Sequence, residues 1–413
     1  MSTILTMSMQ LFAYNPQAQP VNHTGSSDMS AEMKTFYDDL LIDTAGPNLV
    51  HEQFGQKRPI PKNKGKTIEF RKYSPLAKAI TPLTEGVTPD GKKLEVTAIT
   101  ATVDQYGDFV PLTDMIELTT IDNNVVEATK LLGKQAGLTM DTVVRDAINT
   151  GTNVSYASSF SGSTETTHST RYSLTADSKL TVLEVQKAVR KLKRKNAPKM
   201  SDGNYVAIIH PDVAFDIMRD PEWVEAHKYA QPEEIYKGEI GKIAGCRFVE
   251  STEAKIFCGA DLSATSRTLT TSGAVSASKA IGVTQTLVAD ALVGRYVIIG
   301  TGKYKITANT TNQITVDENV TASSGATIYP GEGGADGIAV YSCLFLGSDA
   351  YGVTDVTGGG LETIVKPLGS GDDPLNQRST VGWKGIKVAE ILTEDYMVRV
   401  EVGSSSSTTA EAN

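Results

Sequence analysis

Residues that could do chemistry are few and scattered along the chain. His210 with Asp212 and Asp216 offers groups suited to acid/base catalysis, but Pro211 places them at a junction between a strand and a helix, where turn chemistry is favoured. The segment from Gly300 to Lys303 offers glycines and a lysine to a phosphate group. It lacks the spacing of a phosphate-binding loop and lies between predicted strands instead of before a helix.

No other constellation suggests catalysis. The chain has no Gly-x-Ser-x-Gly elbow, no His-Glu-x-x-His helix and no zinc-ligand spacing, and its five histidines are far apart. We therefore predict no catalytic residue, no metal site and no cofactor.

Three cysteines, Cys246, Cys258 and Cys343, form no Cys-x-x-Cys pair, so a reducing compartment is the simplest interpretation. The N-terminus lacks a basic region followed by an apolar one, and no run of eighteen apolar residues occurs. We expect neither export nor insertion into a membrane.

The net charge of -9 is unevenly distributed. Residues 57–93 contain ten Lys or Arg against three acids, and residues 181–195 contain six against one, so the remainder is strongly acidic. Such a chain suits contact with different partners on different faces, one of them a polyanion. Charged surfaces that are merely exposed to solvent and bind no partner explain the pattern equally well.

The stretch from Asp122 to Gly151 predicts one long helix, around which the other elements are organised. Its apolar face is predicted at steps of three and four residues, namely Val125, Ala128, Leu132, Ala136, Met140, Val143 and Ala147. Asp122, Asn123 and Asn124 are candidate caps, and Gly151 is a candidate left-handed stop. Gly133 and Gly137 either allow another backbone to approach closely or lie on an exposed face.

Residues 65–103 change to the two-residue period of strands and predict a long hairpin with several turns between residues 81 and 91. A shift of the apolar phase at Ile99 suggests a bulge. Two isolated strands are marginal in water, so the hairpin is expected to rest on another surface, such as another subunit.

The N-terminal segment has two parts. Residues 1–30 have no period and predict an extended arm, while residues 30–41 predict a short amphipathic helix capped by Ser30. Its apolar face consists of Met33, Phe36, Tyr37, Leu40 and Leu41.

A second helix is predicted from the capping box at Thr181 and Glu184, with its apolar face at Val185, Ala188, Val189 and Leu192. Four cations near its C-terminal half either face DNA or merely complement the helix dipole from a solvated face, namely Lys187, Lys191, Arg194 and Lys195.

Residues 259–337 are rich in Thr and Ser and predict several short strands, typical of an inserted β-sandwich or barrel whose ends lie close together. Strands are also predicted at residues 205–209, 341–346 and 361–366, and residues 388–392 are expected to pair with residues 397–402. The tail, residues 404–413, is predicted to be disordered.

Several stretches, in their order and spacing, resemble tailed-bacteriophage major capsid proteins, and most closely the branch typified by the N-four podovirus. They are Gly65–Phe70, Leu83–Pro89, Gln105–Gly107, Ile208–Pro211, Gly241–Gly245, Asp373–Leu375 and Val381–Lys384. The resemblance covers residues 30–402 except the insertion, and it implies an α+β protein of the Hong Kong 97-type fold with structural and not catalytic motifs.

The resemblance also implies a domain organisation. Residues 1–61 would be the N-terminal arm, 62–104 the E-loop, 105–197 with 371–403 the peripheral domain, and 198–370 the axial domain containing the 259–337 insertion. Thr84, Glu85 and Gly86 of the E-loop would contact a neighbouring subunit. The isopeptide cross-link of one relative can be assigned to no residue of this chain.

The function implied by the resemblance is that of a head protein which self-assembles into hexamers and pentamers around double-stranded DNA. Its partners would be itself, a portal, scaffold or decoration proteins and DNA without sequence specificity, but no membrane. It would assemble in the host bacterial cytoplasm and reside in the virion shell. The residues leave two alternatives, a receptor-binding or tail β protein suggested by the Thr-rich insertion, and an α/β enzyme suggested by alternating elements.

Overall fold

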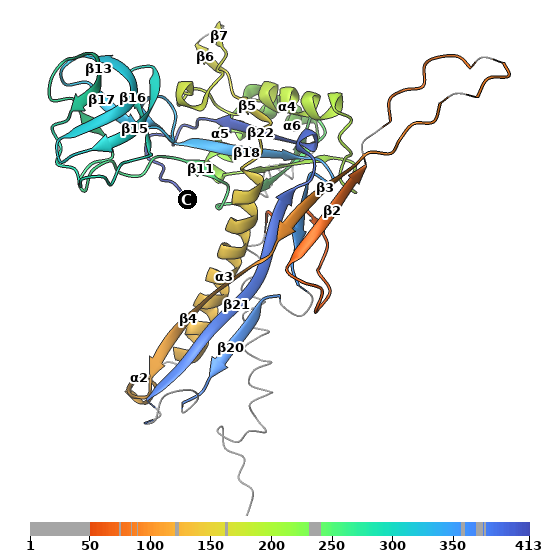
Figure 1. Cartoon of the computed structure of the whole chain (residues 1–413), viewed down its shortest axis with the longest axis horizontal. Coiled ribbons are helices and arrows are strands. Elements are labelled where there is room, and N and C mark those ends of the chain that lie inside the picture. The colour runs from red at the N-terminus through yellow and green to blue at the C-terminus, as the bar shows by residue number, and fades with distance from the viewer. Residues whose placement is uncertain are drawn as a thin grey trace, which may run out of the picture.

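A long helix, α3 (Asn124–Ile148), runs from the distal end of the molecule into its upper part (Figure 1). The computed structural model describes residues 50–73, 76–83, 85–88, 90–119, 124–161, 164–230, 241–356, 360–368, 375 and 377–413. The predicted N-terminal arm up to residue 49, its helix, and the candidate caps Asp122 and Asn123 lie outside these residues.

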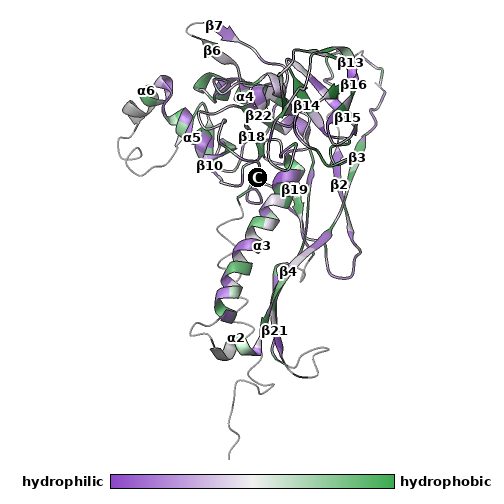
Figure 2. Ribbon diagram, turned by 90° about the vertical axis from the view of Figure 1, so that its left-hand side faces the viewer, coloured by the Kyte–Doolittle hydropathy of each residue, from purple (hydrophilic) through white to green (hydrophobic). Residues whose placement is uncertain are grey.

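The distal part pairs α3 with a mixed sheet, and Figure 2 shows the two side by side from another direction. The sheet centres on one long strand that pairs with three others in antiparallel fashion, with a short parallel strand at its edge. In the order of the chain, its strands are β1 (Gln56–Lys57), β4 (Asp104–Thr113), β19 (Tyr351–Thr354), β20 (Glu362–Lys366) and the central β21 (Arg378–Ile391). A short helix, α2 (Asp114–Thr119), follows β4.

The predicted long helix is confirmed, and its packed face is now defined. Leu132, Ala136 and Met140 form a core with Val381 and Trp383 of β21. A Cβ on Gly385 would lie 2.7 Å from the Met140 Cε, so the helix and strand are in close contact there.

One detail of the helix prediction is wrong, and the structure decides between the two alternatives left open for its glycines. The buried apolar residues of the helix beyond Met140 are Val144 and Ile148, whereas Val143 and Ala147 are only partly buried, because the packed face continues in steps of four. Gly133 and Gly137 are both buried, which excludes the exposed-face interpretation.

Gly151 does not adopt the left-handed conformation that was expected of it. Instead, the Glu394 carboxylate accepts hydrogen bonds from the main-chain N–H groups of Thr152 and Asn153 just beyond the helix. The space at Gly151 is limited by Met397, whose Cε would lie 3.1 Å from a Cβ there.

A buried carboxylate lies two-thirds of the way along α3. Asp141 and His51 are both fully buried, and the Asp141 carboxylate accepts from the His51 main-chain N–H at 2.7 Å and lies 2.6 Å from the His51 Nδ1. The Tyr351 hydroxyl of β19 donates to the His51 carbonyl. These groups join the start of the described chain to the long helix and to the distal sheet.

The upper part is built on a seven-stranded sheet whose two faces are both covered. In spatial order its strands are β5 (Val154–Tyr156), β22 (Met397–Val402), β18 (Val340–Leu346), β8 (Tyr205–Ile209), β10 (Cys246–Glu250) and β9 (Lys242–Ile243), with β11 (Ile256–Phe257) beside β18. The helices on it are α4 (Val182–Arg194), α5 (Pro211–Met218) and α6 (Pro221–Ala230).

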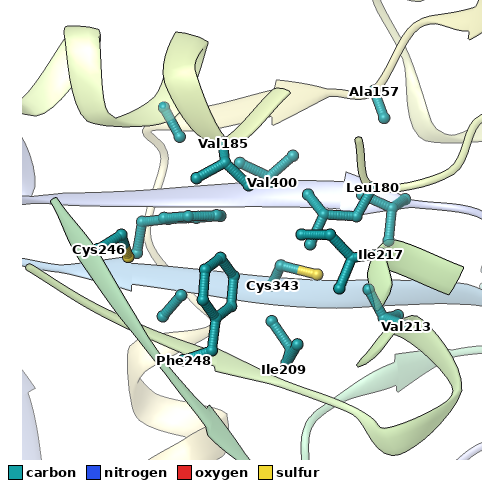
Figure 3. Close-up of a cluster of buried hydrophobic side chains, with 14 of the residues drawn as sticks. Ala157, Leu180, Val185, Ile209, Val213, Ile217, Cys246, Phe248, Cys343 and Val400 are labelled. Carbon is teal, nitrogen blue, oxygen red and sulfur yellow. The ribbon is translucent and has the colours of Figure 1, made fainter. Parts of the chain in front are cut away.

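Alternate side chains of the central strands enter two different cores. Ile209 and Cys343 pack with residues of α4 and α5, as Figure 3 shows. Ile208 and Leu344 point to the opposite face, where they meet the end of α3. Because both faces are covered, β8 and β18 are buried throughout and largely apolar, which is why the sequence predicted them correctly.

The pairing predicted at the C-terminus is wrong. Residues 388–391 belong to β21 in the distal sheet, whereas β22 pairs with β18 and β5 in the upper sheet. The segment between them is a short 3₁₀ turn, η4 (Glu394–Tyr396), which carries the chain from one sheet to the other instead of closing a hairpin.

A six-stranded sheet with a separate core is formed by residues 269–330. In spatial order its strands are β12 (Leu269–Thr270), β17 (Thr327–Pro330), β14 (Tyr296–Ile299), β15 (Gly302–Asn309), β16 (Gln313–Ala322) and β13 (Val275–Gly282). A bridge between Thr271 and Val283 connects the two ends of this order, as in a small barrel. The segments leading into and out of the insertion are adjacent, as expected, because Phe257 pairs with Val340.

The remaining elements are short. They are the hairpin β2 (Thr67–Tyr73) with β3 (Val96–Thr102), the hairpin β6 (Ser159–Ser161) with β7 (Thr164–Thr166), and the 3₁₀ turns η2 (Arg171–Ser173) and η3 (Ala335–Gly337).

The C-terminal tail differs from its prediction, since it packs on the body. The Asp216 carboxylate of α5 accepts from the Ser404 hydroxyl and from the Ser405 main-chain N–H, each at 2.8 Å. At the other end of the tail, the Asn413 main-chain oxygen accepts from Lys255, and its side-chain oxygen accepts from the main-chain N–H of Ile256. Hydrogen bonds of this kind, which hold a mostly polar segment, leave no periodic signal in the sequence.

Replacing residues 259–337 by a short Gly/Ser linker should leave a folded protein, because the insertion has a separate core and its flanking strands pair with each other. We expect native-like far-UV circular dichroism per residue and a cooperative unfolding transition. In a control that removes residues 256–337, β11 is lost as well and stability should fall further. An insoluble protein from the first deletion would show that the host core depends on the insertion.

Asp141→Ala should lower the free energy of unfolding by about 3–5 kcal/mol, because it leaves the buried N–H and ring of His51 without their acceptor. Asp141→Asn keeps one acceptor and should cost less. The control on the same helix is Glu127→Gln, whose exposed contact with Lys130 should be worth at most about 0.5 kcal/mol. Denaturant unfolding of the unassembled protein measures all three, and equal losses would refute the role given to Asp141.

Candidate assembly and nucleic-acid surfaces

The hairpin β2–β3 is anchored at its base. Its register is continuous from Thr67 opposite Thr102 to Tyr73 opposite Val96, so the predicted bulge is absent. Phe70 is 4% exposed and packs on Gly352, where a Cβ would lie 2.8 Å from the Phe70 Cζ. The base therefore belongs to the packed body.

Beyond Tyr73 the hairpin projects away from the body as a long loop (Figure 1). Its large apolar side chains are exposed, from 48% at Val96 to 82% at Ile80, and the others are Tyr73, Leu76, Leu83, Val87 and Leu94. A group of exposed apolar side chains of this size marks an interaction surface.

Of the three predicted contact residues in this loop, Thr84 lies outside the described residues. Glu85 and Gly86 are both exposed, and Gly86 has a φ of +78°, which explains the need for glycine at this turn. The Lys92 side chain donates to the Ala77 carbonyl at 3.1 Å, which links the two sides of the loop.

The helix α4 positions the four predicted DNA-facing cations. Its buried face consists of Val185, Ala188, Val189 and Leu192, as predicted, together with Val182. Thr181 is the N-cap and accepts from the Glu184 N–H at 3.4 Å. The reciprocal half of the capping box is not made, because the Glu184 carboxylate instead binds the Ser158 N–H and the Lys187 ammonium.

Lys187 is enclosed by acceptors. Its Nζ lies 2.7 Å from the Glu165 carboxylate and 2.8 Å from that of Glu184. Burial lowers the pKa of Lys187, but these hydrogen bonds and charges outweigh burial and raise it overall. Its charge is therefore present but locally neutralised.

The other three cations differ from one another. Lys191 donates to the Ser155 hydroxyl at 2.5 Å, and burial, together with nearby arginines, lowers the pKa of its ammonium. Lys195 forms an exposed ion pair with Asp395 at 3.1 Å. Arg194 is exposed at the end of the helix. The structure thus brings the four residues onto one helix but leaves only part of their charge open to a polyanion.

The residues considered for acid/base chemistry have structural roles. The His210 Nδ1 accepts from the Asp212 N–H and so caps α5, and burial lowers the pKa of the imidazole. The Tyr341 hydroxyl donates to the Asp212 carboxylate at 2.6 Å, while Asp216 holds the C-terminal tail. Each group already has a partner in the fold.

The other chemical candidates lead to the same conclusion. Gly300 and Thr301 form the turn between the antiparallel strands β14 and β15, and Gly302 and Lys303 begin β15, so the lysine does not precede a helix. In the described part of the chain, no group of three or more His, Cys, Asp and Glu side chains is arranged to hold a metal ion. Among the same residues, no helix is both long enough and apolar enough to cross a membrane.

The sequence missed two features. One is the buried His51–Asp141 pair, whose only signal was an acidic residue next to the apolar face of the long helix. The other is a basic cavity between the hairpin base and the body, lined by Arg58, Arg71 and Lys72. Its residues are distant in the chain, so no local pattern indicates it.

Comparisons with known proteins find similarity to phage capsid proteins. Residues 96–252 match the family model described as phage capsid protein. No curated protein matches the chain. Three solved capsid structures are similar over most of the chain.

The capsid of cyanophage Pam1 has 13% identity and a TM-score of 0.55, with 97% of this chain and 99% of that chain covered. The capsid of Ralstonia phage GP4 has 12% identity and a TM-score of 0.54, with 86% and 88% covered. The capsid of cyanophage P-SCSP1u has 13% identity and a TM-score of 0.51, with 86% and 89% covered.

At these identities the structural likeness establishes the fold, which is the α+β capsid fold expected from the sequence. The family match covers the segment from β3 through the long helix and α4 to the end of β10. Residues 96–252 thus match the phage capsid family model, and the chain as a whole has the fold of solved phage capsids.

Proposed function

We propose that the chain self-assembles into hexamers and pentamers of an icosahedral shell that encloses double-stranded DNA, in the branch resembling the N-four podovirus capsids. The observation that carries the proposal is the projecting loop between β2 and β3, whose apolar side chains are uncovered in the single subunit. A group of exposed apolar side chains of this size supports a role in contact with another molecule.

In this proposal the E-loop, including Thr84, Glu85 and Gly86, lies across a neighbouring subunit. A second exposed apolar group lies at the distal end of the molecule, where Phe109 and Met115 are each 62% exposed and Leu131 is 70% exposed. Repeated contacts between two different patches of identical subunits generate closed rings, as hexamers and pentamers require.

We assign the domains as the sequence analysis divides them, with the E-loop at 62–104, the peripheral domain at 105–197 with 371–403, and the axial domain at 198–370. The insertion, residues 259–337, lies on the outer surface in this proposal. Its few basic side chains suit contact with other capsomers, decoration proteins or a host surface better than contact with DNA. A portal and a scaffold are the further expected partners.

The basic residues of α4 are proposed to face packaged DNA and to contact phosphates without reading sequence. Lys191, Arg194 and Lys195 supply most of the available charge, because Lys187 is held by two glutamates. The competing account is that these cations lie in solvent and interact only with the negative C-terminal end of the α4 dipole.

Deleting residues 81–91 should leave a folded chain that assembles poorly, because the described residues of the loop tip are exposed while the hairpin base is buried. Circular dichroism should be unchanged, and electron microscopy should show few shells. Leu83→Ser and Val87→Ser provide a milder variant of the same test, and Val288→Ser on the insertion is the matched control for loss of an exposed apolar side chain. Normal shells from the deletion would contradict the role of the loop.

Replacing Lys191, Arg194 and Lys195 by Gln should weaken DNA association of the unassembled capsomer and make its salt dependence shallower, since fewer counterions are released from DNA. Assembly itself should continue. The control replaces Lys134, Lys279 and Lys366, which are exposed elsewhere, and should change neither. An unchanged salt slope in the α4 variant would favour the solvated face.

A further inference from the structure

A cavity of about 250 Å³ lies between the base of the E-loop hairpin and the upper body. The hairpin contributes Phe70, Arg71, Lys72, Tyr73 and Ile99, the segment before it contributes Gln56 and Arg58, and the body contributes Asp349, Leu392, Thr393 and Tyr396. All of these residues belong to the described chain. The cavity therefore lies between the base of the E-loop hairpin and the body of the subunit.

The charge around the cavity is positive. Three cations line it against the single carboxylate of Asp349. The Lys72 Nζ lies over the Tyr396 ring at 5.9 Å, and the Arg71 side chain is bound by Glu69 at 2.8 Å. Arg58 is exposed, and no hydrogen bond of its guanidinium to another described residue is found. The site offers unneutralised charge next to aromatic and aliphatic side chains.

The size of the cavity indicates what kind of ligand it suits. Small-molecule sites usually measure about 300–1,000 Å³ and are lined predominantly by apolar side chains, whereas this cavity is smaller and carries three cations. A smaller cavity with three cations at its rim suits one or two large apolar side chains from a segment that also carries acidic residues. An amphipathic helix with acids beside its apolar face has this chemistry.

The chain itself contains such a segment. Residues 30–41 predict an amphipathic helix, and residues 1–49 carry five acids against one lysine. Glu32 and Asp39 are seven residues apart, so on a helix they lie on the same edge of the apolar face made by Phe36 and Leu40. The opposite charges of the segment and the cavity are complementary.

The position of the segment in the chain agrees with this pairing. The described chain begins at Val50, where His51 is fixed to the long helix by Asp141, and Gln56 and Arg58 already line the cavity. Eight residues lie between Leu41 and Val50, and the nine steps from Cα to Cα across them reach roughly 30 Å when extended. The segment is therefore tethered close to the cavity at a high effective concentration.

We propose that residues 30–41 dock in this cavity of the same subunit. In the bound state the aromatic residues Phe36 and Tyr37 pack against Tyr73 and Tyr396. Glu32 and Asp39 pair with the cations at the rim. The arm thereby fixes the angle at which the E-loop leaves the body.

The first test uses a cross-link in the unassembled full-length chain. The variant Tyr37→Cys with Tyr73→Cys should form an intramolecular disulfide under mild oxidation, while the three native cysteines are buried. The matched control is Tyr14→Cys with Tyr73→Cys, which places the same thiol on the arm outside the segment. We expect the first pair to form the monomeric link at least tenfold faster than the control.

The second test reverses charges. Glu32→Lys with Asp39→Lys should slow the Tyr37–Tyr73 cross-link several-fold, and adding Arg71→Glu with Lys72→Glu should restore it. Lys78→Glu with Lys93→Glu reverses two exposed E-loop charges outside the cavity and should leave the rate unchanged.

Three outcomes would overturn the proposal. A link formed only between two subunits would assign the cavity to the arm of a second copy. A rate equal to that of the Tyr14 control would show that the arm does not occupy the cavity. If a short DNA duplex abolished the link in the native-charge variant while Arg71→Glu with Lys72→Glu abolished DNA binding, the cavity would instead be a phosphate site.

Discussion

The structure depends on one carboxylate buried inside the long helix. Asp141 accepts two hydrogen bonds from His51, and the carbonyl of His51 is held by Tyr351 of β19. Because an unpaired charge in the interior costs several kcal/mol, these groups fix their mutual geometry. The start of the described chain, the spine and the distal sheet therefore cannot shift independently. An adjacent ion pair between Glu52 and Lys387 links the same segment to β21.

The elements that the sequence predicted correctly are those in which burial has a period. The long helix, α4 and the apolar strands β8 and β18 follow their patterns because one face or both faces lie in a core. The pairing of β22 with β18 instead of β21 could not be predicted, since strand pairing is non-local and the intervening residues permit either a hairpin or a change of sheet. The tail was missed because serine hydroxyls and backbone groups hold it, and its composition alone indicates disorder.

The charged residues also show a local pattern in the sequence, but their partners become visible only in the structure. The sequence showed two basic segments but not which of their charges are neutralised. The structure shows that Lys187 forms ion pairs with Glu165 and Glu184. The two segments also meet in space. Lys195 pairs with Asp395, while Lys72 lies over the ring of the next residue, Tyr396. The end of α4 and the base of the hairpin thus flank one short turn, so a polyanion or an acidic segment that reaches one of them also senses the charge of the other.

The subunit separates the groups that stabilise its fold from those left for contact with other molecules. The cores of the upper sheet, the distal sheet and the insertion are closed without the tip of the E-loop, whose apolar side chains contribute nothing to them. Folding therefore does not require a neighbour, and association can be tuned by the loop without altering the stability of the subunit. The boundary between the packed body and the exposed loop lies within the hairpin, where Phe70 is buried against Gly352 only a few residues from the exposed Tyr73. A rigid base with an uncovered tip gives the loop a defined direction before assembly, which reduces the conformational entropy that association must overcome.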